Sequence, residues 1–362
     1  MRAGPSTMSH KKGTILVTGA NGGLGSAIVS RIVSSPELAS YHGIFTVRNA
    51  GSATALHAAL KPSLSAFSAS HSHEEISLDL SRLGRVREVA STINARVEEG
   101  TIPTIRAIIL NAGYEEFGKQ TWTQDGLDTS FVVNYLGHWL LTLLLLQSMD
   151  RGKARIVWIS SWSQNPEDKR NVMNGAFRHG RHRTMIAEDL EPLAKGTWSP
   201  DIDHEAAWVG GYRRYAASKM CGVAMIHELQ RRLDQDPVLN SISVLAVDPG
   251  TMATGIVRQS PWFVRVVVFR IFAGMLADVL VYLFPNGTWR TPQKSARDVL
   301  AAAFDCGPSP LNERPKSLYL NGSKTGEYNN EAKDPKKGHV IWEGSVRFTQ
   351  LAEHETMLQN WQ

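Results

Sequence analysis

The sequence predicts an α/β protein whose single domain is built on a doubly wound parallel sheet of the Rossmann type. Two observations lead to this prediction. Short apolar runs alternate with stretches of helical periodicity along most of the 362 residues, and the first run is followed by a glycine-rich turn that opens a helix. The apolar runs place strands near residues 14–18, 42–47, 74–78, 106–110, 155–160, 241–247 and 316–320, with helices between them.

The glycine-rich turn lies between the apolar run 14–17 and a helical stretch that is clear from Ala27 onward. Glycine allows positive φ and lets the backbone approach a ligand, while the free N–H groups of a first helical turn attract a pyrophosphate. The turn therefore predicts a dinucleotide-binding loop, although its spacing, T-G-x-x-x-G-x-G, differs from the common G-x-G-x-x-G. The residues expected to contact the cofactor here are Thr18, Gly19, Asn21, Gly22, Gly23, Leu24 and Gly25.

A second motif, Y-x-x-x-K, lies in the helical stretch from Tyr212 to Leu233. Residues four apart share a face of a helix, so Tyr215 and Lys219 point the same way. A free tyrosine has a pKa of about 10, and a neighbouring ammonium favours its phenolate. The motif thus predicts a tyrosine with a lowered pKa that exchanges protons with a substrate.

In this order, the two motifs resemble those of the short-chain dehydrogenase/reductase family. The resemblance covers residues 13–255 and continues more weakly to about residue 345. The run N-x-L-G-H-x-L-L-T at 134–142, the T-P-Q at 291–293 and the segment 341–345 look like the retinol dehydrogenase and protochlorophyllide reductase branch. The overall sequence also resembles fungal members of the family that act in secondary metabolism.

The resemblance implies roles for residues outside the two motifs. Catalysis would use Asn134, which holds a proton-relay water in the family, and Ser161, which hydrogen-bonds the substrate oxygen, together with Tyr215 and Lys219. Tyr215 and Lys219 would also contact the cofactor. Asn111 is expected mainly to tie strands together. The remaining cofactor contacts that the family pattern implies are Asp79, Leu80, Asn111, Ala112, Gly113, Pro249, Gly250, Thr251 and Thr254.

The end of the second strand indicates which nicotinamide cofactor is bound. An acidic residue there would bind the 2′-hydroxyl of NAD, but Val47 stands at that place and Arg48 follows. A guanidinium pairs with a 2′-phosphate and stacks on adenine, so the sequence favours NADP(H). Gly22 stands where some NADP-using relatives carry a second basic residue, and an ordinary surface arginine is the alternative for Arg48.

Two segments exceed the minimal family pattern. An insertion at 163–211 separates Ser161 from Tyr215, and its polar, proline-containing composition predicts an irregular excursion over the substrate pocket. The second segment is a substrate lid at 256–290. Its apolar part, 260–284, would gain about 6 kcal/mol as a membrane span but lose about 8 to 10 kcal/mol for three charged residues. A span is disfavoured, and contact with a membrane surface stays an alternative.

The termini, the cysteines and the net charge limit the class of protein to which the chain can belong. We expect a disordered tail at 1–12, a dehydrogenase domain at 13–345 and a C-terminal tail at 346–362. Two cysteines, Cys221 and Cys306, predict neither disulfide nor metal site, and no metal is expected. The start of the chain does not resemble a secretory signal, so we expect a cytoplasmic protein, with peripheral contact to an intracellular membrane through 260–284 as the alternative. The net charge of +5 is spread along the chain, which argues against nucleic acid.

The function that these observations favour is NADPH-dependent reduction of a ketone or aldehyde in a hydrophobic, polycyclic substrate such as a polyketide, terpenoid or sterol. The first alternative is oxidation of a retinol-like or steroid-like alcohol. The second is a non-catalytic NADPH-binding regulatory protein. Family members often pair through the helices that carry Asn134 and Tyr215, and a C-terminal segment covering that surface is equally compatible, so homodimer and monomer are both open.

Overall fold

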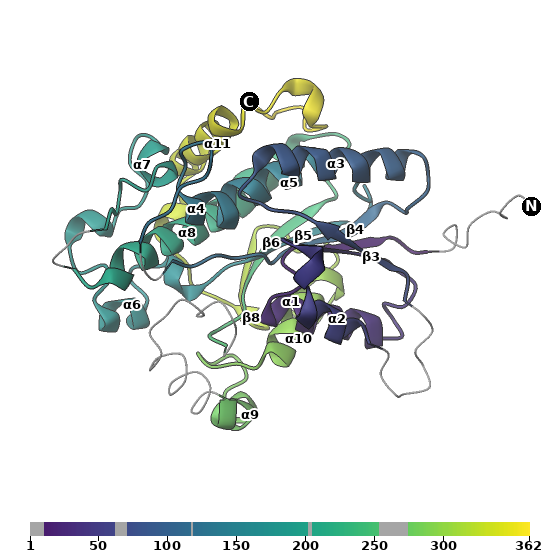
Figure 1. The fold of residues 1–362 in the computed structure, drawn as a ribbon, viewed down its shortest axis with the longest axis horizontal. Helices are drawn as coiled ribbons and strands as arrows, with labels where there is room; N and C mark the ends of the chain where they lie inside the picture. The colour runs from purple at the N-terminus through teal and green to yellow at the C-terminus, as the bar shows by residue number, and fades with distance from the viewer. Residues whose placement is uncertain (1–10, 62–70, 117–118, 202–204, 253–273) are drawn as a thin grey trace, which may run out of the picture.

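A computed structural model of the chain describes residues 11–61, 71–116, 119–201, 205–252 and 274–362. Its centre is an eight-stranded sheet in the order β3-β2-β1-β4-β5-β6-β7-β8 (Figure 1). All neighbours are parallel except β7 and β8. This order is that of a doubly wound sheet and confirms the predicted fold class. The strands are β1 (Thr14–Val17), β2 (His42–Val47), β3 (His73–Ser77), β4 (Ile105–Leu110), β5 (Arg155–Ile159), β6 (Ser243–Asp248), β7 (Leu318–Asn321) and β8 (Lys324–Thr325).

The seven predicted strands coincide with β1 to β7 to within two residues at either end. Strand β8 was not expected, because two polar residues carry no periodic signal. Side chains alternate across the sheet, so Ile15 and Val17 join one core while Leu16 joins the other. A strand buried on both faces is mostly apolar, and β1, β4 and β5 each show such a run.

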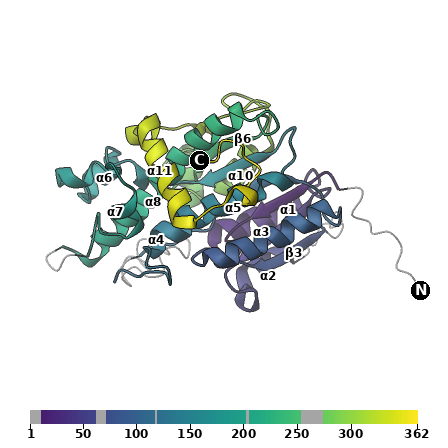
Figure 2. The same ribbon diagram turned by 90° about the horizontal axis from the view of Figure 1, so that it is seen from above.

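Helices cover both faces of the sheet (Figures 1 and 2). One face carries α1 (Gly23–Ser34), α2 (Thr54–Leu60) and α10 (Pro292–Phe304). The other carries α3 (Leu83–Glu98), α5 (Gly137–Leu145), α8 (Ala207–Gln235) and α11 (Pro335–Thr349). The shorter helices are α4 (Thr129–Phe131), α6 (Lys169–Asn174), α7 (Glu191–Ala194) and α9 (Gly274–Leu283). The 3₁₀ turns are η2 (Ala50–Ser52), η4 (Leu146–Ser148), η5 (Trp162–Gln164), η6 (Gly180–His182), η9 (Asn330–Lys333) and η10 (Glu353–Glu355), and η3 (Val132–Leu136) is a π-helix.

The segment Thr129–Ser148 runs as one helix through α4, η3, α5 and η4. Among the described residues it alone is long and apolar enough to cross a membrane, and 89% of its most apolar window is buried inside the protein. Its apolar composition is therefore that of a core helix.

The insertion at 163–211 contains α6, η6 and α7, and its last residues already belong to α8, which begins at Ala207 rather than near Tyr212. Phe177, Met185 and Ile186 are buried in the core that also contains α8. The polar composition of the insertion gave no sign of these contacts. Of the expected lid at 256–290, residues 256–273 lie outside the described part of the chain, and α9 is its first described element.

The two ends of the described chain are packed against the domain. Lys11 and Lys12, at the end of the expected disordered tail, bind the backbone oxygens of Ala39 and Ser40, and residues 1–10 lie outside the described part. The expected C-terminal tail from residue 346 begins inside α11. Beyond α11, Leu351 and Leu358 are buried in the core, so the segment 351–362 is a packed part of the domain.

Candidate active site

The glycine-rich loop forms a backbone cradle at the carboxyl end of β1. Gly19 has a φ of +65°, and a Cβ there would come within 2.7 Å of Ala112 Cα. A Cβ on Gly25 would lie 2.2 Å from Gly19 O. Helix α1 begins at Gly23 and has no side-chain cap, which leaves its first N–H groups to an anionic ligand. The loop therefore fits the pyrophosphate of a dinucleotide.

Hydrogen bonds from three polar residues hold this cradle in place. Thr18 Oγ1 accepts from the N–H groups of Asn111 and Ala112 at 2.9 and 3.0 Å. Asn111 Nδ2 donates to the oxygens of Thr18 and Gly19, which is the strand-tying role expected of it. The carboxamide of Asn21 accepts from two N–H groups in the first turn of α2 and donates to Ser52 O, and its expected cofactor contact stays a prediction. Asn21 thus acts as a distant cap for α2.

The other expected cofactor residues lie along the carboxyl ends of β2, β3, β4 and β6. Arg48 is exposed after β2, and its guanidinium makes no hydrogen bond or ion pair with the described residues. Asp79 uses one carboxylate oxygen to bind Ser81, while Leu80 is buried and Gly113 is exposed.

At β6, the backbone at Pro249 and Gly250 turns with a φ of +73° at the glycine. Thr251 Oγ1 accepts a hydrogen bond from Trp162 Nε1 at 3.1 Å, so this turn contacts the residue that follows Ser161. Thr254 lies outside the described residues.

Three of the four expected catalytic residues meet at the carboxyl end of β5. Ser161 follows that strand, and its hydroxyl lies close enough to Tyr215 to lower the pKa of the phenol, while it accepts hydrogen bonds from the N–H and hydroxyl of Ser163. Lys219 lies one turn further along α8, with Nζ 5.7 Å from the centre of the Tyr215 ring. The same Nζ donates to Ile159 O at 3.0 Å. The structure therefore brings Ser161, Tyr215 and Lys219 together as the sequence predicted.

Asn134, the fourth residue, is buried in the π-helical turn η3. Its Oδ1 accepts from Tyr114 N at 2.7 Å, and its Nδ2 donates to Tyr114 O at 2.8 Å. Nδ2 also contacts the hydroxyls of Ser218 and Ser130 at 3.0 and 3.1 Å. Both ends of the Asn134 carboxamide therefore have hydrogen-bond partners within the protein. Through them, Asn134 holds the loop after β4 against α8.

The electrostatics of the site differ from the expected lowering of the tyrosine pKa. Burial raises the pKa of Tyr215 well above its ordinary value, and the carboxylates of Glu115 and Asp248 add to this, while the hydrogen bond from Ser161 opposes it. Burial also lowers the pKa of Lys219 to about 8, against the attraction of Glu115. The expected lowering relied on an oxidised nicotinamide beside Lys219 and stays a prediction for that complex. For the protein alone, desolvation of the phenolate dominates.

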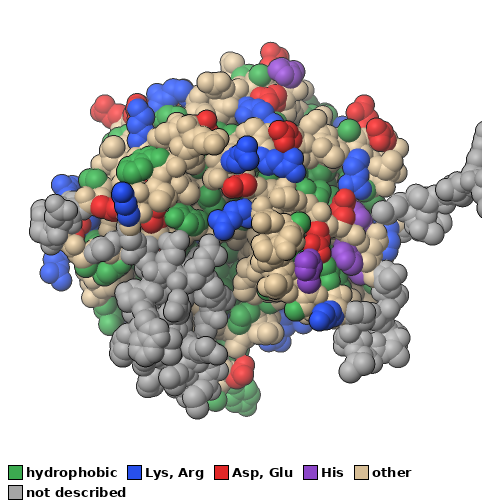
Figure 3. All heavy atoms as spheres, in the orientation of Figure 1, with side chains coloured by type: hydrophobic (Ala, Val, Ile, Leu, Met, Phe, Trp, Pro, Cys, Tyr) green, Lys and Arg blue, Asp and Glu red, His purple; other side chains and the backbone are tan. Residues whose placement is uncertain are grey.

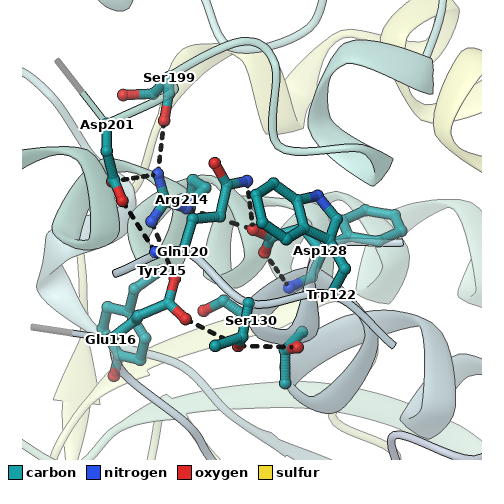
Figure 4. Close-up of polar contacts among 12 residues, drawn as sticks. Glu116, Gln120, Trp122, Asp128, Ser130, Ser199, Asp201, Arg214 and Tyr215 are labelled. Carbon is teal, nitrogen blue, oxygen red and sulfur yellow. Dashed lines mark hydrogen bonds and ion pairs between the residues drawn. The ribbon is translucent and has the colours of Figure 1, made fainter. Parts of the chain in front are cut away.

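The sequence reasoning missed a buried ionic cluster next to Tyr215 (Figure 4). Arg214 pairs with Glu116 at 2.8 Å, with Asp128 at 3.2 Å and with Asp201 at 3.0 Å, and it donates to Ser199 O. These partners come from the loop after β4, the cap of α4 and the insertion. The cluster joins the insertion to the catalytic helix. An arginine immediately before the catalytic tyrosine was the only sequence signal for it.

Two expected absences concern metals and nucleic acids. Within the described residues, no group of three or more His, Cys, Asp or Glu side chains is arranged to hold a metal ion. On the face shown in Figure 3, acidic and basic side chains are interspersed rather than gathered by sign. The charge pattern of that face is therefore not that of a nucleic-acid surface.

Comparison with known proteins agrees with this geometry. A family model described as short chain dehydrogenase matches residues 13–176. Short-chain dehydrogenase iccH of Talaromyces variabilis is 42% identical and covers 98% of this chain and 100% of its own length. Protochlorophyllide reductase B of Oryza sativa subsp. japonica is 26% identical over 95% of this chain and 79% of its own. Among solved structures, the angucycline C-6 ketoreductase LanV with bound NADP has a TM-score of 0.52 at 17% identity, covering 87% of this chain and 96% of that one.

Proposed function

Because the chain belongs to the short-chain dehydrogenase/reductase family and is an oxidoreductase, we propose that it uses NADPH to reduce a ketone or aldehyde of a hydrophobic, polycyclic substrate. The observation that carries the proposal is the meeting of Ser161, Tyr215 and Lys219 beside the glycine cradle. Reduction needs an acid that still holds its proton near neutral pH. The raised pKa of Tyr215 meets this need.

In this mechanism NADPH supplies the hydride when bound. Ser161 orients the substrate oxygen by a hydrogen bond, and Tyr215 gives its hydroxyl proton to that oxygen. Lys219, whose charge favours the phenolate left on Tyr215, then helps to return a proton to it. Asn134 keeps the surrounding loop fixed against α8. Oxidation of an alcohol would instead require Tyr215 to start as a base.

The preference for NADPH is supported by Arg48. Its guanidinium is exposed at the end of β2 and is not engaged by the described residues, so it is available to a 2′-phosphate. No carboxylate stands at Val47, where a 2′-hydroxyl would be bound. The NADP in the angucycline ketoreductase structure agrees with this choice.

A flat, apolar substrate is supported by aromatic rings between Ser161 and Tyr215. Tyr212 lies one turn before Tyr215 and has ring neighbours Trp162 at 6.4 Å and Trp208 at 5.8 Å. Arg170 stacks on Trp162 at 4.3 Å. Aromatic side chains of this kind make stacking contacts with fused rings. The resemblance to a ketoreductase of polycyclic substrates points to the same class.

A cytoplasmic protein that touches an intracellular membrane through residues 260–284 belongs to the same proposal. Its support is α9, on which Tyr282 is 87% exposed and the adjoining Leu283 and Phe284 are also exposed. Exposed apolar side chains on a helix suit the surface of a bilayer. Sedimentation with vesicles of phosphatidylcholine and phosphatidylserine tests this, and a chain that stays in the supernatant would contradict it.

The experiment that tests the proposed function compares NADPH and NADH by fluorescence titration, first with the chain and then with Arg48→Ala. We expect NADPH to bind more tightly, and Arg48→Ala to remove that difference while Arg31→Ala, an exposed arginine on α1, retains it. Tyr215→Phe should then abolish NADPH consumption with polycyclic ketones and leave NADPH affinity nearly unchanged. A fully active Tyr215→Phe enzyme would overturn the mechanism. Equal or tighter NADH binding would overturn the cofactor assignment and favour alcohol oxidation.

A further inference from the structure

Glu115 lies in a short segment whose backbone is pinned on both sides. The N–H and the carbonyl of Tyr114 both bind the carboxamide of Asn134. On the other side, the carboxylate of Glu116 pairs with Arg214 at 2.8 Å. The position of Glu115 is therefore fixed by its neighbours and not by its own side chain.

The segment crosses α8 on the face that carries the catalytic residues. A Cβ on Gly211 would lie 2.0 Å from Glu116 O, so the backbone of Glu116 rests directly on Gly211. Gly211, Tyr215 and Lys219 are spaced by four residues and share one face of the helix. Glu115 is thus held beside that face, one turn from Tyr215.

The carboxyl of Glu115 lies close to residues of α8 and, among the described residues, makes no contact within the ionic cluster. Tyr114 Oη donates to Glu116 Oε1 at 3.4 Å, so the side chains on either side of Glu115 contact each other. When it is ionised, Glu115 changes the pKa of Tyr215, Lys219 and Tyr212, which all belong to α8.

The carboxyl of Glu115 makes no hydrogen bond or ion pair with the described residues, although it is partly buried. Groups of this kind at an active site usually serve a ligand. Burial also raises the pKa of Glu115 to about 8, so that near neutral pH it holds a proton that it can donate.

We propose that Glu115 contacts the substrate and hydrogen-bonds a second oxygen, a hydroxyl or a carbonyl, that lies near the carbonyl being reduced. The proposal rests on the proposed function of the site. It adds to Ser161 and Tyr215, which take the reacting oxygen, a third polar contact for a different oxygen. The enzyme then selects oxygenated ring systems over plain hydrocarbons that carry one ketone.

The test measures ketone binding without turnover. The Tyr215→Phe chain is loaded with NADPH at pH 7 and titrated by calorimetry with 1-tetralone and with 4-hydroxy-1-tetralone, which differ by one hydroxyl. We expect the hydroxylated ketone to bind about tenfold more tightly, the effect of one hydrogen bond to a partly buried group. Adding Glu115→Ala should remove this preference. Glu115→Gln should keep most of it, because an amide still donates and accepts.

Glu98→Ala, at an exposed position on α3, is the matched control and should retain the preference. Unchanged NADPH affinity in each variant shows that the site still folds. Equal affinities for the two ketones, no binding of the hydroxylated ketone, or a preference that survives Glu115→Ala would each overturn the proposal. Failure of the proposed function appears separately, as weak NADPH binding or as turnover by Tyr215→Phe.

Discussion

Thr18 Oγ1 and His138 Nε2 lie 2.8 Å apart, and this buried hydrogen bond joins the cofactor loop to the helix that carries Asn134. Thr18 Oγ1 already accepts two backbone N–H groups, so it gives its own proton to the nearer acceptor, His138 Nε2. His138 is neutral, because burial and the charge of Lys219 lower its pKa to about 3. Its Nδ1–H then faces Asn134 O at 3.4 Å. The glycine cradle and the catalytic helices are thus connected by a single chain of hydrogen bonds.

Replacing Thr18 should damage both the fold and the cofactor site. Thr18→Val leaves the N–H of Ala112 and a ring nitrogen of His138 without partners, while the N–H of Asn111 keeps its bond to Ile109 O, and this costs about 3 kcal/mol in the free energy of unfolding. NADPH affinity should fall with it, while Thr18→Ser keeps the hydroxyl and both properties. Urea denaturation and NADPH titration of the two variants check this. A Thr18→Val protein as stable as the parent would show that the hydrogen bonds contribute little.

The rate of reduction should fall above a pH of about 8. Lys219 has its pKa lowered to about 8 by burial, so it carries its ammonium below that pH and loses it above. Without that charge, the phenolate formed when Tyr215 gives up its proton is less favoured. NADPH consumption measured from pH 6 to 10 should be level up to about pH 8 and then decline. Glu115→Gln should still show the decline, since Lys219 causes it; a rate unchanged to pH 10 would contradict the assignment.

Stability should rise on mild acidification because of Asp128. Burial raises the pKa of Asp128 to about 6, although Arg214 and the N–H of Phe131 oppose this, and the unfolded value is 3.8. Between these two pH values the folded state holds a proton that the unfolded state has lost, so stability increases as the pH falls. From pH 6 to pH 4.5 this group should add about 2 kcal/mol. Asp128→Asn should lose that pH dependence in urea denaturation at the two pH values, and an identical dependence in both proteins would contradict it.

The chain should be a monomer in solution. Family members often pair through the helices that carry Asn134 and Tyr215, but here α11 packs on α8 and Trp342 contacts Trp139 at 5.3 Å. Trp342 Nε1 donates to Trp361 O, which holds the C-terminal segment over it. Light scattering should report one chain for the full protein. Truncation after Gln350 should expose Trp342 and produce self-association or a lower melting temperature, and a full-length dimer would contradict the prediction.

The cofactor loop and the catalytic pair were predictable because their signals are local. Gly19 is required by its positive φ and Gly25 by the close approach of Gly19 O, and the spacing of Tyr215 and Lys219 follows from one turn of helix. The strands were predictable because burial on both faces makes them apolar throughout. Family resemblance added Asn134 and Ser161, which carry no local signal of their own.

The features that were missed depend on residues far apart in the chain. Arg214 pairs with Glu116, 98 positions away, and with an insertion whose path no periodicity describes. The pKa of Tyr215 depends on its burial and on the approach of Glu115, whereas the sequence shows only its neighbour Lys219. By itself, then, the sequence determined the fold class, the cofactor cradle and the residues expected to catalyse. Only the tertiary structure decided the pKa values of these groups and the ion pairs of Arg214 that hold the surrounding segments together. The physical reason is that desolvation and buried ion pairs arise when distant segments pack together.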